Sequence, residues 1–258
     1  MQEIIAFANS LADKSGEIVQ KYFRQPFDVE SKADASPVTV ADKEIEKTLR
    51  EMIEAKYPHD GILGEEYGIV KGDSGRTWVI DPIDGTKSFM IGRPTFGTLI
   101  AVCDGDIPQI GIIDQPILKE RWVGTGNKTF MNGKAVKTRP CKDLHDARIG
   151  STTPMMFDKS EEYGRAYHLF EQNQSRMAWG GDCYMYGLIA SGFMDIAFEQ
   201  NLSPYDFAAL VPIIKGAGGH ISDWRGDELT LNSTGKVIAV GDPDLWPALD
   251  RKIKKSPF

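Results

Sequence analysis

The sequence predicts an α/β layered fold made of two tightly joined halves, and three observations predict it. Of the 258 residues, 41% are hydrophobic, which is enough for a real core. Segments with the apolar period of helices and segments with the composition of strands recur along the chain. Hairpin-linked strands dominate before residues 143–147, and strands alternate with helices after them. We therefore expect an N-terminal half, 1–145, and a C-terminal half, 146–258.

The N-terminal half is expected to begin with two helices. Apolar residues over 4–22 recur with the 3.6-residue period of a helix. A polar loop, 31–37, follows. A second helix should begin near Thr39, with Asp42 three residues on as a capping-box-like pair, and should end before Pro58.

Strand-like runs then predict an antiparallel sheet, because Asp104-Gly105 and Asn132-Gly133 are typical of hairpin turns. The expected strands of this half cover residues 62–64, 78–80, 95–102, 109–114 and 120–125. In the C-terminal half the expected strands cover 148–152, 176–179, 194–198, 220–223 and 237–240. The expected helices of that half cover 160–172, 183–191, 206–216 and 243–254.

Composition argues against several classes of function. The net charge of −7 disfavours general nucleic-acid binding, which needs a basic surface. No apolar run approaches the roughly 20 residues of a membrane span. The N-terminus has no basic region of the kind that begins a signal peptide. Three cysteines without metal-type spacing fit a reducing compartment, so we expect a cytoplasmic protein.

The segment from Asp81 to Thr86 is the most informative part of the chain. Its two carboxylates, Asp81 and Asp84, follow an apolar run, and the alternating faces of a plain strand would point them apart. Pro82 has no N–H for a ladder, so we expect a turn that brings both carboxylates to one point. Like charges so close repel each other unless a cation lies between them. If a helix starts at Gly85, its N-terminus favours a phosphate.

This segment alone also fits a strand followed by an ordinary Asp-Gly turn. The metal hypothesis is favoured by further acidic residues at the predicted ends of elements, which are Glu65, Asp206, Glu199 and Asp42. Simpler interpretations exist, since Asp42 and Asp206 fit helix caps and Glu65 fits a solvated turn. Carboxylate oxygens with a backbone carbonyl suit Mg²⁺ or Mn²⁺, whereas zinc prefers histidine and cysteine.

These residues resemble the motifs of the inositol monophosphatase-like superfamily of Mg²⁺-dependent, lithium-sensitive phosphomonoesterases. The resemblance covers nearly the whole chain, and its motifs are Gly64-Glu65-Glu66, residues 78–86, and Tyr205-Asp206 followed by residues 216–219. It implies an αβαβα sandwich, a small phosphorylated metabolite as substrate, and a homodimer. It also implies that the N-terminal half carries the main metal-binding motifs and that the C-terminal half completes the active site.

The resemblance implies two or three bound Mg²⁺ ions. Glu65, Asp81 and the Ile83 carbonyl would bind one ion, and Asp81, Asp84 and Asp206 would bind a second. Glu65 would also help to hold a weaker third ion through water. Mn²⁺ would suit the same ligands.

The resemblance also implies the catalytic residues. Thr86 and Glu65 would orient and deprotonate the attacking water, and Asp42 would act through Thr86. The amides of Gly85 and Thr86 would bind the phosphate, and no cysteine, serine or histidine nucleophile is needed. The residues expected to contact the substrate are Asp84, Gly85, Thr86, Asp182, Glu199 and Asp206.

Within the superfamily the chain is most similar to histidinol-phosphate phosphatases. The similar segments are residues 84–89, 92–99, 113–117, 120–122 and 180–184. Asp182 is the informative residue, because inositol-type enzymes usually carry a small neutral residue there. A carboxylate near the leaving group would pair with the ammonium group of histidinol phosphate, and Glu199 would line the same pocket. Asp182 also fits an N-cap of the helix over 183–191.

The leading hypothesis is therefore hydrolysis of L-histidinol phosphate to L-histidinol and phosphate, the step before histidinol oxidation in histidine synthesis. The alternative is a phosphatase of the same fold that acts on inositol or other sugar and nucleotide monophosphates. A non-catalytic scaffold is disfavoured, because the residues that would bind metal and activate water are all intact, namely Glu65, Asp81, Asp84, Thr86 and Asp206.

Overall fold

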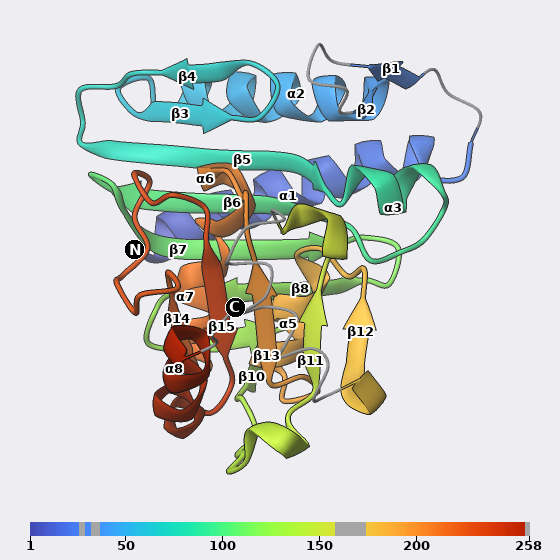
Figure 1. Ribbon diagram of the computed structural model, residues 1–258. Coiled ribbons are helices and arrows are strands. Elements are labelled where there is room, and N and C mark those ends of the chain that lie inside the picture. Colours follow the sequence, from blue (N-terminus) through green and yellow to red (C-terminus); the bar gives the residue numbers. More distant parts are fainter. Residues whose placement is uncertain (26–28, 32–36, 158–173, 256–258) are drawn as a thin grey trace.

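The protein is described by a computed structural model over residues 1–25, 29–31, 37–157 and 174–255 (Figure 1). The first part of the chain forms two long helices and a large sheet. The helices are α1 (Gln2–Tyr22), α2 (Val40–Lys56) and the short α3 (Thr86–Met90). The strands are β1 (Val29–Ser31), β2 (Pro37–Thr39), β3 (Gly61–Gly64), β4 (Gly68–Val70), β5 (Arg76–Asp84), β6 (Gly97–Asp104), β7 (Ile107–Gln115), β8 (Glu120–Gly124), β9 (Thr129–Met131) and β10 (Lys134–Val136).

The second part of the chain forms a smaller sheet and short helices. Its strands are β11 (Ile149–Ser151), β12 (Met177–Trp179), β13 (Ile196–Glu199), β14 (His220–Ser222) and β15 (Val237–Val240). Its α-helices are α5 (Tyr184–Ala190), α6 (Pro204–Phe207), α7 (Leu210–Gly216) and α8 (Trp246–Lys255). Four short 3₁₀ helices accompany them: η1 (Leu144–Asp146), η2 (Pro154–Met156), η3 (Gln174–Arg176) and η4 (Pro243–Leu245). The helix expected over 160–172 lies outside the described residues.

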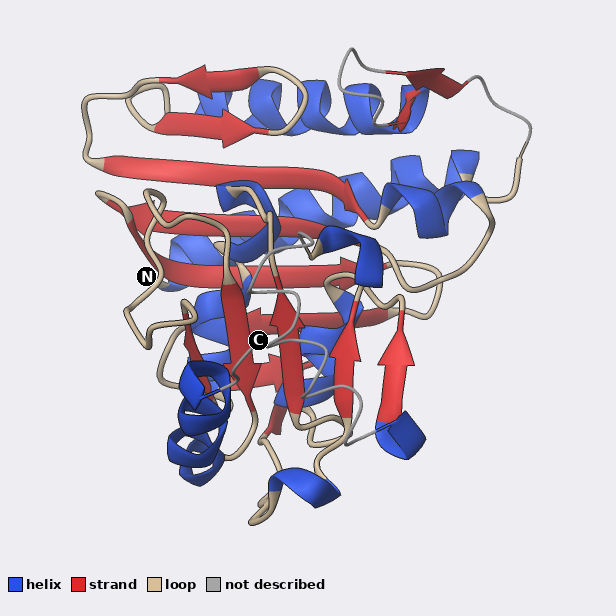
Figure 2. Cartoon of the chain, in the orientation of Figure 1, coloured by secondary structure: helices blue, strands red, loops and turns tan. Residues whose placement is uncertain are grey.

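These elements stack in five layers, which confirms the predicted αβαβα sandwich (Figures 1 and 2). Helices α1 and α2 pack on one face of the eight-stranded sheet, whose order is β10-β9-β8-β7-β6-β5-β3-β4. Helices α5, α6 and α7 lie between that sheet and the five-stranded sheet, whose order is β12-β11-β13-β15-β14. Helix α8 covers the outer face of the smaller sheet. No helix of the described residues is long and apolar enough to cross a membrane.

Three apolar clusters fill the spaces between the layers. One joins α1 and α2 to the large sheet around Trp78, and another lies between the two sheets around Trp122. The third packs α8 against the smaller sheet around Trp224. The cluster between the sheets contains residues from both parts of the chain, from Val79 to Ala239. The division into two halves near residue 145 therefore stays a prediction.

Most predicted elements are confirmed, and the differences have physical causes. The large sheet is mixed rather than antiparallel, because β4 pairs on one side of β3 and the chain then passes to the other side, where β5 lies parallel to β3. The exposed strand β4 was not predicted, and the expected polar loop over 31–37 is bordered by the paired strands β1 and β2.

The helix predicted over 206–216 is divided into α6 and α7, with residues 208–209 in a turn. Pro212 lies in α7, has no N–H to give to the carbonyl of Ala208, and its ring disfavours a continuous helix at that carbonyl. The division ends α6 one residue after Asp206, so that this aspartate lies in the first turn of a separate short helix.

The turn predicted at Pro82 is wrong, because β5 continues through this residue to Asp84. The register shifts there: Asp81 lies opposite Leu99 of β6, and Asp84 lies opposite Gly97. Three steps along β5 thus match two steps along β6, which is a β-bulge with one extra residue. A bulge tolerates proline, and the extra residue turns the two carboxylates to the same face of the sheet.

Candidate active site

Three aspartates meet where the large sheet faces α6. Asp81 and Asp84 come from the bulge of β5, and Asp206 comes from the first turn of α6. One carboxylate oxygen of each lies within 4.8 Å of the others. Asp206 is oriented by a capping box, in which its Oδ2 accepts a hydrogen bond of 2.7 Å from the backbone N–H of Ser203. Asp206 thus has a capping role, as the N3 residue of a box whose N-cap is Ser203, and the same carboxylate also faces the other two.

Two further acidic residues lie near this cluster. Glu65 follows β3 directly, and Asp42 lies buried in the first turn of α2. Burial, followed by the charges of Glu65, Asp84, Asp206 and Asp42, raises the pKa of Asp81 well above its usual value. The fold thus brings five predicted site carboxylates together from four separate parts of the chain.

Burial and mutual repulsion perturb the other two aspartates in the same direction. The pKa of Asp84 is raised well above its usual value by burial and then by the charges of Asp182 and Asp206. Burial raises the pKa of Asp206 to about 7, against the hydrogen bond from Ser203 that lowers it. Such a cluster is costly when ionised, and a bound cation would remove the cost.

The residues present fit a hard divalent cation. The donors are carboxylate oxygens, with the Ile83 carbonyl on the same strand, and these suit Mg²⁺ or Mn²⁺. Asp81 is 2% exposed, and its Oδ1 has no hydrogen-bond partner within the described part of the chain. A buried acceptor without a donor is costly unless a cation or water binds it. The geometry therefore supports the metal hypothesis over the ordinary Asp-Gly turn.

Gly85 and Thr86 form the turn from β5 into α3. Gly85 adopts the left-handed conformation, with φ of 85°, and a Cβ there would lie 2.8 Å from Cγ of Asp182. Only glycine satisfies both constraints. The hydroxyl of Thr86 donates a hydrogen bond of 3.1 Å to the carbonyl of Ile83. The expected link from Asp42 to Thr86 stays a prediction.

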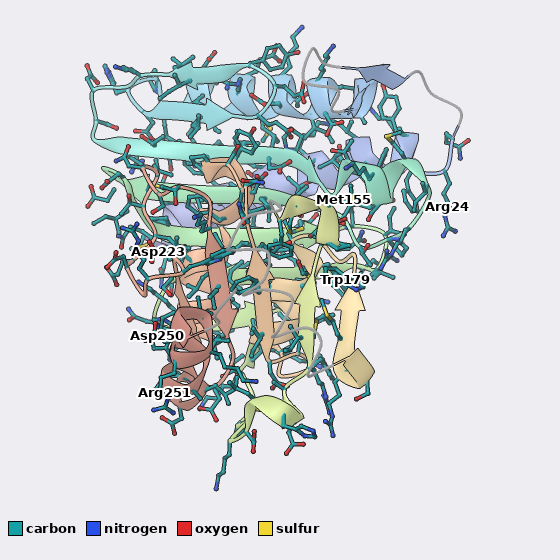
Figure 3. The ribbon with its side chains drawn as sticks, viewed as in Figure 1. Arg24, Met155, Trp179, Asp223, Asp250 and Arg251 are labelled. Atoms are coloured by element: carbon teal, nitrogen blue, oxygen red, sulfur yellow. The ribbon has the colours of Figure 1, made fainter. Side chains whose placement is uncertain are left out.

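A pocket of about 110 Å³ opens beside the aspartate cluster. Its lining includes four predicted site residues, Asp84, Asp182, Glu199 and Asp206. Figure 3 shows Met155 and Trp179 on the side of the smaller sheet that lies nearest α3. Because Asp84 ends β5 and Glu199 ends β13, the pocket lies between the end of β5 and the smaller sheet, and residues from both parts of the chain form it.

Asp182 is held beside the β5–α3 turn. Its Oδ2 accepts a hydrogen bond of 2.8 Å from the hydroxyl of Ser88, and its backbone has a positive φ of 46°. Helix α5 begins at Tyr184 with Cys183 as its N-cap, so the interpretation of Asp182 as the N-cap is wrong. Burial raises the pKa of Asp182, while Ser88 and nearby positive charges act against the shift.

Glu199 lines the same pocket and is 2% exposed. Its Oε1 accepts a hydrogen bond of 3.1 Å from the Thr152 N–H, and its Oε2 accepts one of 2.7 Å from the Tyr186 hydroxyl. Burial raises the pKa of Glu199, although both hydrogen bonds lower it. Both oxygens are thus engaged, so Glu199 shapes the pocket and adds charge to it.

Cys183 adjoins the cluster and gives no support to a thiol nucleophile. Its backbone N–H donates to Asp84, and its side chain is buried. Burial and the charges of Asp84 and Asp182 raise the pKa of the Cys183 thiol well above its usual value. A thiol is reactive as the thiolate, so this environment makes Cys183 inert.

Glu46 is a site residue that the sequence interpretation missed. It is fully buried on α2, and its carboxylate accepts hydrogen bonds from the N–H groups of Glu66 (2.7 Å) and Tyr67 (3.1 Å). Arg50 donates to the same carboxylate at 2.8 Å. A Cβ at Gly64 would lie 2.0 Å from Glu46 Oε1, which explains the glycine before Glu65. The Glu-Arg spacing of four on α2 was the available signal, although it is common on exposed helices.

Comparisons with known proteins agree with this geometry. A model of the inositol monophosphatase family matches residues 1–256. A chloroplastic bifunctional phosphatase of Arabidopsis thaliana is 45% identical over 95% of this chain and 73% of its own length. A histidinol-phosphatase of Chlorobaculum parvum is 36% identical over 91% of each chain. A solved inositol monophosphatase structure from Zymomonas mobilis has a TM-score of 0.89 and 43% identity over 98% of each chain. The chain therefore belongs to the inositol monophosphatase family of metal-dependent phosphatases.

Proposed function

We propose that this phosphatase hydrolyses L-histidinol phosphate to L-histidinol and phosphate with Mg²⁺, as a step of histidine biosynthesis. The observation that carries this proposal is the carboxylate of Asp182, which lines the pocket beside Asp84 and is fixed by the Ser88 hydroxyl. The histidinol-phosphatase of Chlorobaculum parvum is among the chain's relatives, which supports the same substrate.

The charge of the pocket favours a substrate that carries a cation. Asp182 and Glu199 add two acidic groups beyond those expected to bind metal. Histidinol phosphate has an ammonium group near its phosphate, and a charge-assisted hydrogen bond to Asp182 would be stronger than one to a hydroxyl. A neutral polyol gains less from a buried carboxylate and still has to desolvate it.

In the proposed reaction each residue has a stated task. Glu65, Asp81, Asp84, Asp206 and the Ile83 carbonyl would bind the metal ions. When bound, Mg²⁺ lowers the pKa of water and neutralises charge on the phosphoryl oxygens. In this structure the Thr86 hydroxyl donates to the Ile83 carbonyl. In the proposed reaction it would donate to Asp42 instead, and its oxygen would accept a hydrogen bond from the attacking water and orient it.

Glu65 would then accept the proton of that water, and Asp42 would support Thr86 from α2. The N–H groups of Gly85 and Thr86 would bind the phosphate, at the start of α3. Asp182 would bind the ammonium group on the leaving-group side. The assigned groups cover nucleophile activation, phosphate binding and leaving-group recognition. As the P–O bond breaks, the leaving alkoxide would take a proton from water, so that the products are the alcohol and phosphate.

The second candidate is a phosphatase for inositol or other sugar and nucleotide monophosphates. It is favoured by the likeness to the solved inositol monophosphatase structure of Zymomonas mobilis, at 43% identity. The metal ligands would be the same in both candidates. They differ only in what Asp182 recognises.

The test is phosphate release with Mg²⁺ from L-histidinol phosphate and from myo-inositol 1-phosphate, measured side by side. We expect kcat/KM to favour histidinol phosphate by about a hundredfold, which corresponds to about 2.7 kcal/mol. A preference for the inositol ester would establish the second candidate instead. Loss of all phosphate release on removal of divalent ions is expected for both.

Replacing Asp182 by asparagine tests the recognition step. Asparagine keeps an oxygen that can accept from Ser88, so only the charge is lost. We expect KM for histidinol phosphate to rise by about tenfold, as for one lost charge-assisted hydrogen bond. KM for p-nitrophenyl phosphate, which has no ammonium group, should change by less than about twofold. Equal changes for both substrates would contradict the assignment.

We also propose that the protein is cytoplasmic, forms a homodimer, and has neither nucleic acid nor membrane among its partners. The acidic net charge of −7 supports the absence of a nucleic-acid partner. Analytical ultracentrifugation would test the dimer, for which a single species of twice the chain's 28.6 kDa is expected.

A further inference from the structure

We propose that Thr98, with Ser15 behind it, is a positioning residue that holds the bulge of β5 and so the metal-binding arrangement of Asp81 and Asp84. This inference rests on the proposed Mg²⁺ site. It adds two residues that belong neither to the candidate metal ligands nor to the lining of the pocket. Their role follows from the geometry of the two strands.

The bulge sets two residues of β5, Pro82 and Ile83, against the single residue Thr98 of β6. Without the extra residue, side chains three positions apart would point to opposite faces of the sheet. The two aspartates could then not share a cation. The arrangement of the metal ligands therefore depends on whatever stabilises the bulge against regular pairing.

The Thr98 hydroxyl stabilises it directly. Its Oγ1 donates a hydrogen bond of 2.8 Å to the carbonyl of Pro82, at the point where the ladder is interrupted. Ser15 of α1 lies 2.6 Å away, Oγ to Oγ1. Because Thr98 has one hydroxyl proton and gives it to Pro82, Ser15 must be the donor to Thr98. The chain of donors runs from helix α1 through β6 to the bulge.

Both hydroxyls are shielded from water, since Thr98 is 1% exposed and Ser15 is 0% exposed. In such surroundings a carbonyl that loses its donor cannot find water in exchange, so the backbone moves to satisfy it. The backbone that would move here is Pro82, which is bonded directly to Asp81. Loss of the Thr98 hydroxyl is therefore transmitted to a metal ligand.

Valine has nearly the shape of threonine without its hydroxyl, so Thr98→Val removes the hydrogen bond and little volume. Groups that orient metal ligands typically change metal affinity by 10–100-fold when they are lost. We expect the Kd for Mg²⁺ of Thr98→Val to rise by about tenfold or more. Thr98→Ser keeps the hydroxyl, and we expect its Kd to stay within about twofold of the wild type.

Thr129 provides a matched control. It is also 1% exposed, and its Oγ1 donates a hydrogen bond of 2.6 Å to a backbone carbonyl, that of Ile213. Thr129→Val thus removes the same kind of buried hydrogen bond, from a residue on β9 that does not line the pocket. It should lower the melting temperature comparably and leave the Kd for Mg²⁺ within about twofold of the wild type.

The experiment is titration calorimetry of the metal-free protein with Mg²⁺ alone, together with thermal melts of each variant. Weak binding by Thr98→Val, with normal binding by Thr98→Ser and Thr129→Val, would support the inference. Unchanged binding by Thr98→Val, or equal weakening in both valine variants, would overturn it. Absence of Mg²⁺ binding by the wild type would instead overturn the metal assignment itself.

Ser15→Ala gives a second measurement if Thr98→Val does not fold. It leaves Thr98 and its bond to Pro82 in place and removes only the hydroxyl that donates to Thr98. Hydrogen bonds in a chain strengthen one another, so the loss should weaken the bond at the bulge. We expect a smaller rise in the Kd for Mg²⁺, about threefold. An unchanged Kd in this variant would refute the role of Ser15.

Discussion

The replacement Asp206→Asn should stabilise the metal-free protein while removing its response to Mg²⁺. The ionised carboxylate of Asp206 is buried among other acidic groups, which raises its pKa to about 7 from the ordinary value of 3.8. Each pKa unit corresponds to about 1.4 kcal/mol between the two protonation states. At pH 8, without metal, ionised Asp206 therefore costs the fold up to about 4 kcal/mol.

Relaxation of the surrounding carboxylates reduces this cost, and we expect the asparagine variant to be more stable by about 2 kcal/mol. For a chain of this length, that corresponds to a rise in melting temperature of about 4–8 °C. Asparagine keeps an oxygen for the N–H of Ser203, so the capping box is preserved. The variant therefore removes a charge and little else.

The pH dependence has a definite sign. A folded-state pKa above the unfolded one means that the folded protein binds a proton more tightly, so this group favours folding at low pH. The advantage of Asp206→Asn should be absent below about pH 4, the usual aspartate pKa. It should grow as the pH rises to about 7, the pKa of the folded state, and remain constant above it.

Melts in EDTA and in saturating Mg²⁺, at several pH values, would test this. In Mg²⁺ the wild type should gain stability and the variant should gain much less. Asp223→Asn is the control, because Asp223 (labelled in Figure 3) lies in a turn outside the lining of the pocket, where its Oδ1 accepts hydrogen bonds from the N–H groups of Arg225 and Asp227. A variant at position 206 that is no more stable than wild type in EDTA at pH 8 would refute the reasoning.

Three further replacements follow from the same structure. Asp84→Asn should abolish turnover and leave the melting temperature in EDTA unchanged or raised, because it removes a metal ligand and a repelling charge. Glu46→Gln should cost about 3 kcal/mol in urea unfolding, because it removes the negative charge that balances the buried Arg50, and should lower kcat as the turn after Glu65 loosens. Burial raises the pKa of Asp60, but hydrogen bonds from Arg76, Ser74 and Trp78 outweigh burial, so that the pKa is lowered overall. Because it weakens these hydrogen bonds, Asp60→Asn should cost about 2 kcal/mol at pH 7.

Each of these has a contrary outcome. Near-normal phosphate release by Asp84→Asn would contradict the metal assignment. A stable Glu46→Gln protein with unchanged kcat would show that the turn holds its shape without the carboxylate. Because the pKa of Asp60 is lowered in the folded state, its stabilisation should begin to decrease as the pH falls below about 3.9, the ordinary aspartate pKa, and should be lost as the pH falls through the lower pKa of the folded state. A cost of Asp60→Asn that is the same at pH 3 and pH 7 would argue against an electrostatic origin.

Much of the fold and most of the acidic cluster could be predicted from the sequence. Periodicity located α1 and α2, and hairpin signals located the turn from β6 to β7 and the turn from β9 to β10. Pairing could not be predicted, because it depends on strands distant along the chain. The bulge of β5 is the clearest case: the spacing of Asp81 and Asp84 contradicts a plain strand, and only the register with β6 explains it. The division between α6 and α7 is different, because Pro212 was a signal in the sequence against the single helix expected over 206–216.

The residues that sequence reasoning missed share one property: through hydrogen bonds they hold the acidic groups, or the backbone next to them, in place. A group of buried carboxylates repels itself, so it cannot keep its own geometry when the metal leaves. Here Glu46 holds the turn after Glu65, Ser88 holds Asp182, and Thr98 holds the bulge. Each of these residues lies on a different element from the group that it supports, and patterns in a single sequence carry no signal for such pairs. The charge of the site is therefore readable from the sequence, whereas its preorganisation is a property of the folded chain.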